Sequence, residues 1–147
     1  MHIQNIKNTA LAVLSAVGSV IASALGGWDA ALGVLLGMMA ADYLSGLALA
    51  IAFRASPKTE GGAFSSAVSF RGLMRKLSVL VVVWVGVMLD RVLAADYVRT
   101  AVILFFTANE GLSVLENTAL MGVPYPAFVK SALEALRQRA GEGEKEE

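Results

Sequence analysis

The sequence contains no cysteine, and its single histidine is His2, at the start of the chain. Disulfide bonds and thiol chemistry are therefore excluded, and one histidine does not supply the ligand set of a zinc site. No glycine-rich phosphate loop and no Ser/His/Asp set is present either. We therefore expect no enzymatic activity, no catalytic residue, no metal ion and no cofactor.

Charged residues are also scarce, since they make up 16% of the chain, whereas soluble domains carry about 25%. Lys and Arg balance Asp and Glu at twelve each, so the net charge is zero and nothing favours nucleic acid as a partner. Apolar side chains are in excess, at 56% of the 147 residues. They fall into blocks close to the ~20 residues that a helix needs to cross a bilayer. This composition predicts an all-α integral membrane protein.

Four apolar blocks follow one another, and we expect each to form a helix within a single transmembrane domain over residues 1–139. They cover residues 9–26, 30–53, 77–95 and 97–117. The first block carries serine at every fourth position, so it either spans the membrane or lies at its surface, and the count is three or four spans. Glycine and other small residues at four-residue spacing in the first two blocks favour close helix packing.

Two further segments follow the last apolar block. In residues 127–139 apolar side chains recur at the spacing of one helix face, with polar side chains between them, which predicts a short amphipathic helix. Residues 140–147 are acidic and contain glycine, which is typical of a disordered tail.

The polar stretch between the second and third blocks, residues 54–76, is rich in basic residues. Its cations are Arg54, Lys58, Arg71, Arg75 and Lys76. Because Lys and Arg prefer the cytoplasmic side of a membrane, we expect this loop, and the C-terminus two crossings later, to be cytoplasmic. Lys7 places the N-terminus on the same side if the first block spans. The preference of Lys and Arg for the cytoplasmic side is enough to explain why this loop is basic. The functional alternative is that the loop also contacts anionic lipid headgroups.

Carboxylates inside the apolar blocks are costly, at about 2.5–3.5 kcal/mol each at a lipid-facing helix centre. They are Asp42, Asp90, Glu110 and Glu116. They must therefore face another helix, another subunit or water. The polar residues of the fourth block recur at spacings of three and four, which places them on one side of a helix; they are Asn109, Glu110, Ser113, Glu116 and Asn117.

Three interpretations of these intramembrane polar residues stay open. They hold helices together by hydrogen bonds, or they line a water-filled pore once subunits assemble, or they relay ions or protons in a small transporter. Transporters of that kind usually contain internal repeats, and none is visible here.

Several segments, taken in order, carry a resemblance to a known family. They are Asp42-Tyr43-Leu44-Ser45-Gly46, Ser69–Lys76, Leu89-Asp90, Asn109–Asn117 and Gly122-Val123-Pro124-Tyr125-Pro126. Over roughly residues 28–137, this order resembles the phage holin and toxin-secretion holin family that includes clostridial toxin-release proteins. The most specific part is the Asn-Glu-Gly-x-Ser-x-x-Glu-Asn run with the Gly-x-Pro-x-Pro that follows it.

The resemblance implies a protein that accumulates in the bacterial cytoplasmic membrane, associates with copies of itself and opens lesions at a set time in host lysis. An endolysin, or in some relatives a toxin, then escapes without necessarily touching the protein. The residues that match the family pattern are Asp42, Tyr43, Gly46, Glu110, Ser113, Glu116 and Asn117. Ser45, Asp90 and Asn109 complete our candidates for pore lining or helix packing. The alternative function is a small ion channel or transporter subunit, or a membrane scaffold, that uses the intramembrane carboxylates.

Overall fold

The computed structural model describes residues 2–128 and residue 131 of the chain. Its long helices are α1 (His2–Ala24), α2 (Ala30–Ala48), α3 (Ser66–Leu93) and α4 (Val98–Leu120). A π-helical turn, η1 (Leu49–Phe53), extends α2, and a 3-10 turn, η2 (Glu60–Gly62), lies in the connection to α3. The described residues contain no strand, which confirms the predicted all-α fold. The expected amphipathic helix at 127–139 falls largely outside the described residues, and the expected tail at 140–147 falls entirely outside them.

Four helical stretches are long and apolar enough to cross a membrane, and the shortest of them has 21 residues, the longest 28. At 1.5 Å per residue these lengths correspond to about 32 and 42 Å, against a hydrocarbon core of about 30 Å. The stretch nearest the N-terminus, Gln4–Ala24, is one of the four.

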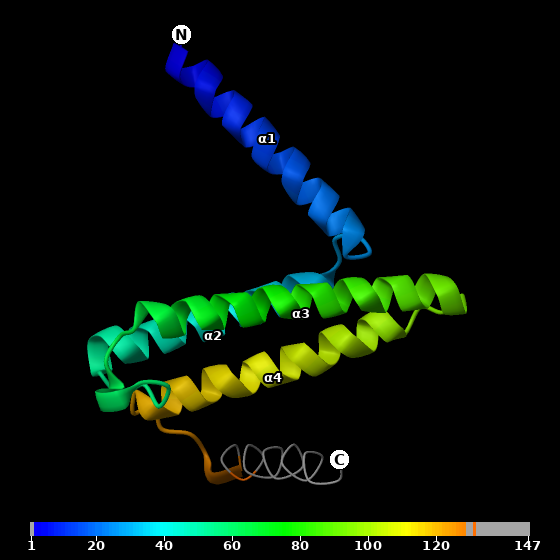
Figure 1. The fold of residues 1–147 in the computed structure, drawn as a ribbon. Coiled ribbons are helices and arrows are strands. Elements are labelled where there is room, and N and C mark those ends of the chain that lie inside the picture. Colours follow the sequence, from blue (N-terminus) through cyan, green and yellow to red (C-terminus); the bar gives the residue numbers. More distant parts are fainter. Residues whose placement is uncertain (1, 129–130, 132–147) are drawn as a thin grey trace.

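Helices α2, α3 and α4 form a bundle in which α4 contacts both of the others (Figure 1). Its apolar core consists of Leu25, Leu32, Leu35, Met39, Val79, Val83 and Ile103. On α2 and α3 these residues recur at spacings of three and four, which places them on one face of each helix. The outward faces of the bundle are also rich in apolar side chains, including Val81, Trp84 and Phe105. Apolar residues on all sides of a helix are typical of a lipid environment.

Helix α1 extends away from this bundle (Figure 1). From Gln4 to Ala24 its side chains are exposed, apart from a half-buried Ala22. The turn into α2 contains Gly26 and Gly27 at φ +90° and +95°, a backbone region that glycine enters without steric cost. Within the described residues, the apolar surface of α1 therefore has almost no protein to pack against.

Arg99, in the first turn of α4, holds the turn between α1 and α2 in place. Its Nε donates to the Leu25 carbonyl at 2.6 Å, and its Nη2 donates to the Gly27 carbonyl at 3.1 Å. Its Nη1 pairs with Asp29 at 2.5 Å. The hydrogen bond from Arg99 is the main reason that the pKa of the Asp29 carboxyl lies below its ordinary value. The other oxygen of Asp29 accepts from the Leu32 amide at 2.8 Å and caps the start of α2.

Asp90 performs a similar capping role for α4. Its two carboxylate oxygens accept hydrogen bonds from the Val98 and Arg99 amides, each at 2.9 Å. An amide that begins a helix lacks a partner within the helix, so a carboxylate there satisfies it and also complements the helix dipole. The contacts of Arg99 bring the 25–29 and 94–97 turns to the same end of the bundle, and the 54–65 connection lies at the other end.

Helix α3 begins at Ser66, well before the expected start at residue 77. Arg71, Arg75 and Lys76 are therefore helical residues, and the loop predicted over 54–76 ends before them. The breakers Ser56-Pro57 and Gly61-Gly62 do interrupt the helix, but nothing after Ser65 does. Three basic residues within six positions indicated a loop, whereas Lys and Arg are good helix formers once no proline or glycine pair intervenes.

Candidate functional site

Three charged side chains meet inside the bundle because each continues the apolar face of its own helix. Asp42 follows the buried Leu35 and Met39 at spacings of seven and three on α2. Lys76 precedes the buried Val79 and Val83 on α3 by three and seven residues. Glu110 follows the buried Ile103 by seven residues on α4. Residues at these spacings share one side of a helix, so packing the apolar faces together also brings the three charges together.

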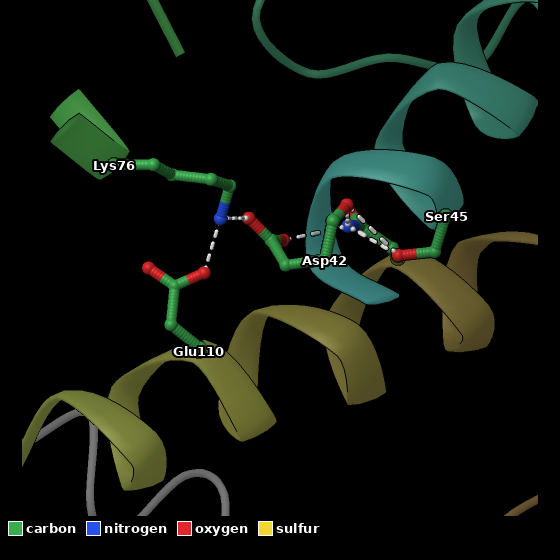
Figure 2. Close-up of polar contacts among 5 residues, drawn as sticks. Asp42, Ser45, Lys76 and Glu110 are labelled. Carbon is green, nitrogen blue, oxygen red and sulfur yellow. Dashed lines mark hydrogen bonds and ion pairs between the residues drawn. The ribbon is translucent and has the colours of Figure 1, made fainter. Parts of the chain in front are cut away.

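Lys76 stands between the two carboxylates (Figure 2). Its ammonium group donates to Asp42 Oδ2 at 2.7 Å and to Glu110 Oε2. The side chains of Lys76, Asp42 and Glu110 are only 8%, 5% and 2% exposed. We call these three residues the charge cluster. Because they come from α3, α2 and α4 respectively, the cluster links all three helices of the bundle.

Asn117 and Ser45 extend the charge cluster by neutral hydrogen bonds. The Asn117 amide nitrogen donates to Asp42 Oδ1 and to Ser45 Oγ, each at 3.0 Å. Ser45 Oγ in turn donates to the Asp42 carbonyl at 3.1 Å (Figure 2). Both carboxylate oxygens of Asp42 are thereby satisfied, as a buried charge requires.

The charge cluster contains two carboxylates and one ammonium group, so its formal charge is −1 when all three are ionised. Asp42 and Glu110 each lie about 15 Å or more, along the helix axis, from either end of the 30–53 and 98–120 helical segments. If these segments cross a bilayer, the charges lie near its centre, where solvation by lipid is poorest. The hydrogen bonds above show that protein partners supply part of the solvation that lipid cannot give.

The chemistry of this site is electrostatic. Among the described residues, no group of three or more His, Cys, Asp or Glu side chains is placed to hold a metal ion. The cluster can hold three helices together while it is closed. If the helices separate, the same residues become a charged surface that attracts water.

The structure divides the candidate polar side of α4 into an inner and an outer part. Glu110 and Asn117 are buried against α3 and α2, and Ser113 is half-buried. Asn109 and Glu116 are exposed on the outside of the bundle.

The remaining candidates lie around the cluster or away from it. Gly46 lies beside Asn117, because a Cβ added there would be 3.5 Å from the Asn117 amide nitrogen. Tyr43 is half-buried on α2, while Asp90 lies at the far end of α3 as the cap of α4. Of the basic residues, Arg54, Lys58, Arg71 and Arg75 are exposed, and Lys76 is buried.

Sequence reasoning missed the roles of Lys76 and Arg99. Lys76 was assigned to a cytoplasmic loop because it ends a run of cations, although its spacing to Val79 and Val83 is that of a core position. Arg99 is not among the candidate residues predicted from the sequence, although it precedes the buried Ile103 by four residues. In both cases helical periodicity was the signal that could have found them.

The chain is similar in sequence to known proteins. A model of the bacteriophage holin family matches residues 19–138. An uncharacterised Clostridium perfringens protein is 36% identical over 125 residues, which cover 84% of this chain and 87% of that protein. A second C. perfringens protein, encoded in the nagH 3′ region, is 35% identical and covers 92% of this chain and 98% of its own length.

A more distant relative is a probable holin of Bacillus phage phi105. It is 39% identical over 66 residues, which cover 44% of this chain and 49% of that protein. No solved structure matches the chain.

Proposed function

Because this chain belongs to the bacteriophage holin family, a family of non-enzymatic membrane proteins, we propose that it forms the lysis lesion of the bacterial cytoplasmic membrane. Copies of the chain associate in that membrane and, at a set time, open a lesion. An endolysin, or a toxin in the manner of some relatives, then escapes through it. The endolysin is a functional partner and needs no direct contact, whereas lipid and further copies of the chain are the physical partners.

The observation that carries this proposal is the charge cluster, buried at the centre of a bundle whose outer surface is largely apolar. A closed bundle of this kind is compatible with lipid, because its charges are paired inside. A lesion that passes water needs a polar wall. Separation of α4 from α2 and α3 would supply one, because it turns Asp42, Lys76 and Glu110 toward water.

Helix α1 supports the self-association part of the proposal. Its surface is largely apolar and makes almost no contact with the rest of the described residues, and small residues recur along it, including Gly18 and Ala22. Helices in lipid associate through such small-residue surfaces. We propose that α1 packs against further copies of the chain.

The proposed orientation follows from the basic residues. The 54–65 connection and the first three turns of α3 lie at one end of the bundle, and together with the sequence after α4 they hold nine of the twelve cations, so this end faces the cytoplasm. With four spans, the N-terminus lies there too. Impermeant thiol labelling of single cysteines near the N-terminus tests this orientation, and the absence of native cysteine keeps the labelling clean.

The decisive experiment is induction of the chain in a bacterium with and without a cytoplasmic endolysin. We expect abrupt loss of viability in both cultures, release of a cytoplasmic reporter enzyme into the periplasm, and lysis only with the endolysin. Depolarisation without passage of the reporter would favour a small ion channel instead. Normal growth and an intact membrane potential would favour a scaffold.

A further inference from the structure

A cavity of about 80 Å³ opens beside the charge cluster, on the side of the 54–65 connection. It lies between the second half of α2, residues 56–59 and the first turns of α3. A single water molecule needs roughly 10–15 Å³ by the same measure. The cavity therefore has room for several water molecules.

The walls of this cavity run from the surface to the centre of the bundle. Lys58 and Arg75, which are exposed, line it together with Asp42, Lys76 and Asn117, which are buried. A cavity that ends on two ionised side chains and an amide offers the polar partners that ordered water requires. An apolar cavity of this size would stay empty, but this one has hydrogen-bonding groups at its inner end.

The cavity does not continue through the bundle. Beyond the charge cluster, toward the 94–97 turn, the helices meet through Leu35, Val83 and Ile103, each no more than 1% exposed. These three side chains pack without polar groups between them, so they separate the cavity from the opposite end of the bundle.

We propose that this cavity is a water-filled vestibule, which connects the charge cluster to the solvent on one side of the membrane only and admits anionic solutes more readily than cationic ones. The vestibule belongs to the closed bundle, so it does not depend on lesion formation. Its water provides the charge cluster, which is formally −1, with solvation that lipid cannot give.

The preference for anions follows from the charges at the mouth. Lys58 and Arg75 line it, and neither forms an ion pair within the described residues. At the inner end the charge cluster is formally −1, so that with Lys58 and Arg75 the formal sum is +1, and Tyr43 is the other ionisable residue in the wall. Two cations at the opening concentrate anions and repel cations.

The test is the reactivity of single cysteines in the full-length chain, in membrane vesicles that expose the 54–65 connection. Gly72 and Ser69 line the vestibule on α3, and a Cβ at Gly72 meets nothing within 4 Å, so Gly72→Cys and Ser69→Cys fit without repacking. The matched controls are Leu73→Cys and Phe70→Cys, one residue further along the same helix, where the side chains are exposed on the surface of the bundle that we expect to face lipid. The probes are the impermeant sulfonatoethyl and trimethylammonioethyl methanethiosulfonates.

Thiols react as thiolates, which form in water and not in hydrocarbon, so Gly72→Cys and Ser69→Cys should react ~100-fold faster than the two controls. After correction for its reactivity with free thiol, the anionic probe should be ~10-fold faster than the cationic one at both lining positions. Vesicles of the opposite orientation should leave these positions unlabelled.

Three results would overturn the proposal. The lining positions could be as slow as Leu73→Cys and Phe70→Cys, which would make the cavity dry. They could be labelled equally from both sides, which would remove the one-sided access. The cationic probe could be the faster one, which would reverse the charge preference of the mouth.

Discussion

Lys76 occupies a core position that a residue such as Leu or Met would fill in an ordinary helix bundle. Its ammonium group replaces water for two carboxylates at once, and Asn117 completes the hydrogen bonds of Asp42. A buried ion pair adds little net stability compared with apolar packing, because desolvation is costly. Removal of one partner is different, since it leaves a buried charge without compensation. The cluster is thus better suited to the opening of the bundle that we propose than to maximal stability.

The first prediction concerns Lys76→Met, which keeps the length of the side chain and removes its charge. Asp42 and Glu110 then face each other without a cation, so we expect a loss of about 3–5 kcal/mol of unfolding free energy. The measurement is reversible unfolding in mixed micelles at neutral pH. Arg75→Met is the matched control, because Arg75 is the adjacent cation and is exposed; its effect should stay within about 0.5 kcal/mol. Equal effects of the two substitutions would contradict the role assigned to the cluster.

The second prediction concerns the pH dependence contributed by Asp29, which lies in the turn before α2. Its pKa is lowered from 3.8 in the folded chain, mainly by the hydrogen bond from Arg99. The stabilisation is therefore fully present above the unfolded value and is lost as the pH falls through the lower, folded value. Unfolding of wild type should thus become easier below about pH 4 to a greater extent than unfolding of Asp29→Asn, which keeps a capping side chain. Parallel pH profiles for the two proteins would show that the pairing contributes nothing.

At the scale of the helix, close approach and apolar periodicity decide which surfaces meet. Gly86 on α3 lies against the backbone of α4, since a Cβ added there would be 3.1 Å from the Arg99 Cα. Gly37 on α2 belongs to a small-residue stripe that the sequence offered as a packing surface, yet a Cβ there meets nothing within 4 Å. Gly86 therefore marks a close contact between α3 and α4, whereas the small-residue surface of α2 at Gly37 meets no neighbour within 4 Å.

The third prediction compares Gly86→Ala with Gly37→Ala. Both replace glycine by alanine within a helix, which by itself favours folding by up to about 1 kcal/mol. At Gly86 the added methyl group forces α3 and α4 apart, so we expect a net loss of about 1–3 kcal/mol. At Gly37 the propensity gain should remain. Unfolding free energies in the same micelles provide the comparison, and a gain at both positions would refute the close contact between α3 and α4.

The sequence predicts the features that depend on neighbouring residues better than those that depend on contacts between residues far apart in the chain. Apolar blocks and glycine or proline breakers are local signals, and they lead to the all-helical fold and to four candidate spans. The charge cluster is not local, because Lys76 is 34 residues from both Asp42 and Glu110. A run of cations such as Arg71, Arg75 and Lys76 looks polar until its partners are known. Only tertiary packing separates Lys76, which is buried, from Arg75, which is not.

At the scale of the whole molecule, two unlike parts are joined by one turn. The α2–α3–α4 bundle satisfies its charges internally, whereas α1 extends from it and has apolar surface to spare (Figure 1). Arg99 links the parts at the 25–29 turn. Such a molecule can associate through α1 while the bundle stays closed. The energy that holds the bundle closed would then set how readily an assembled lesion opens.

The fourth prediction joins this energy to the proposed function. In the endolysin culture, Lys76→Met should lyse earlier than wild type at the same membrane level of protein, because the closed bundle is destabilised while the opened one exposes Asp42 and Glu110 to water. Each 1.4 kcal/mol lost from the closed state favours opening about tenfold, so the shift in onset should be large. Arg75→Met should lyse at the wild-type time. Gly86→Ala should also advance lysis, since it weakens the same bundle without touching a charge. Unchanged onset in both Lys76→Met and Gly86→Ala, at matched protein levels, would mean that the bundle does not open when the lesion forms.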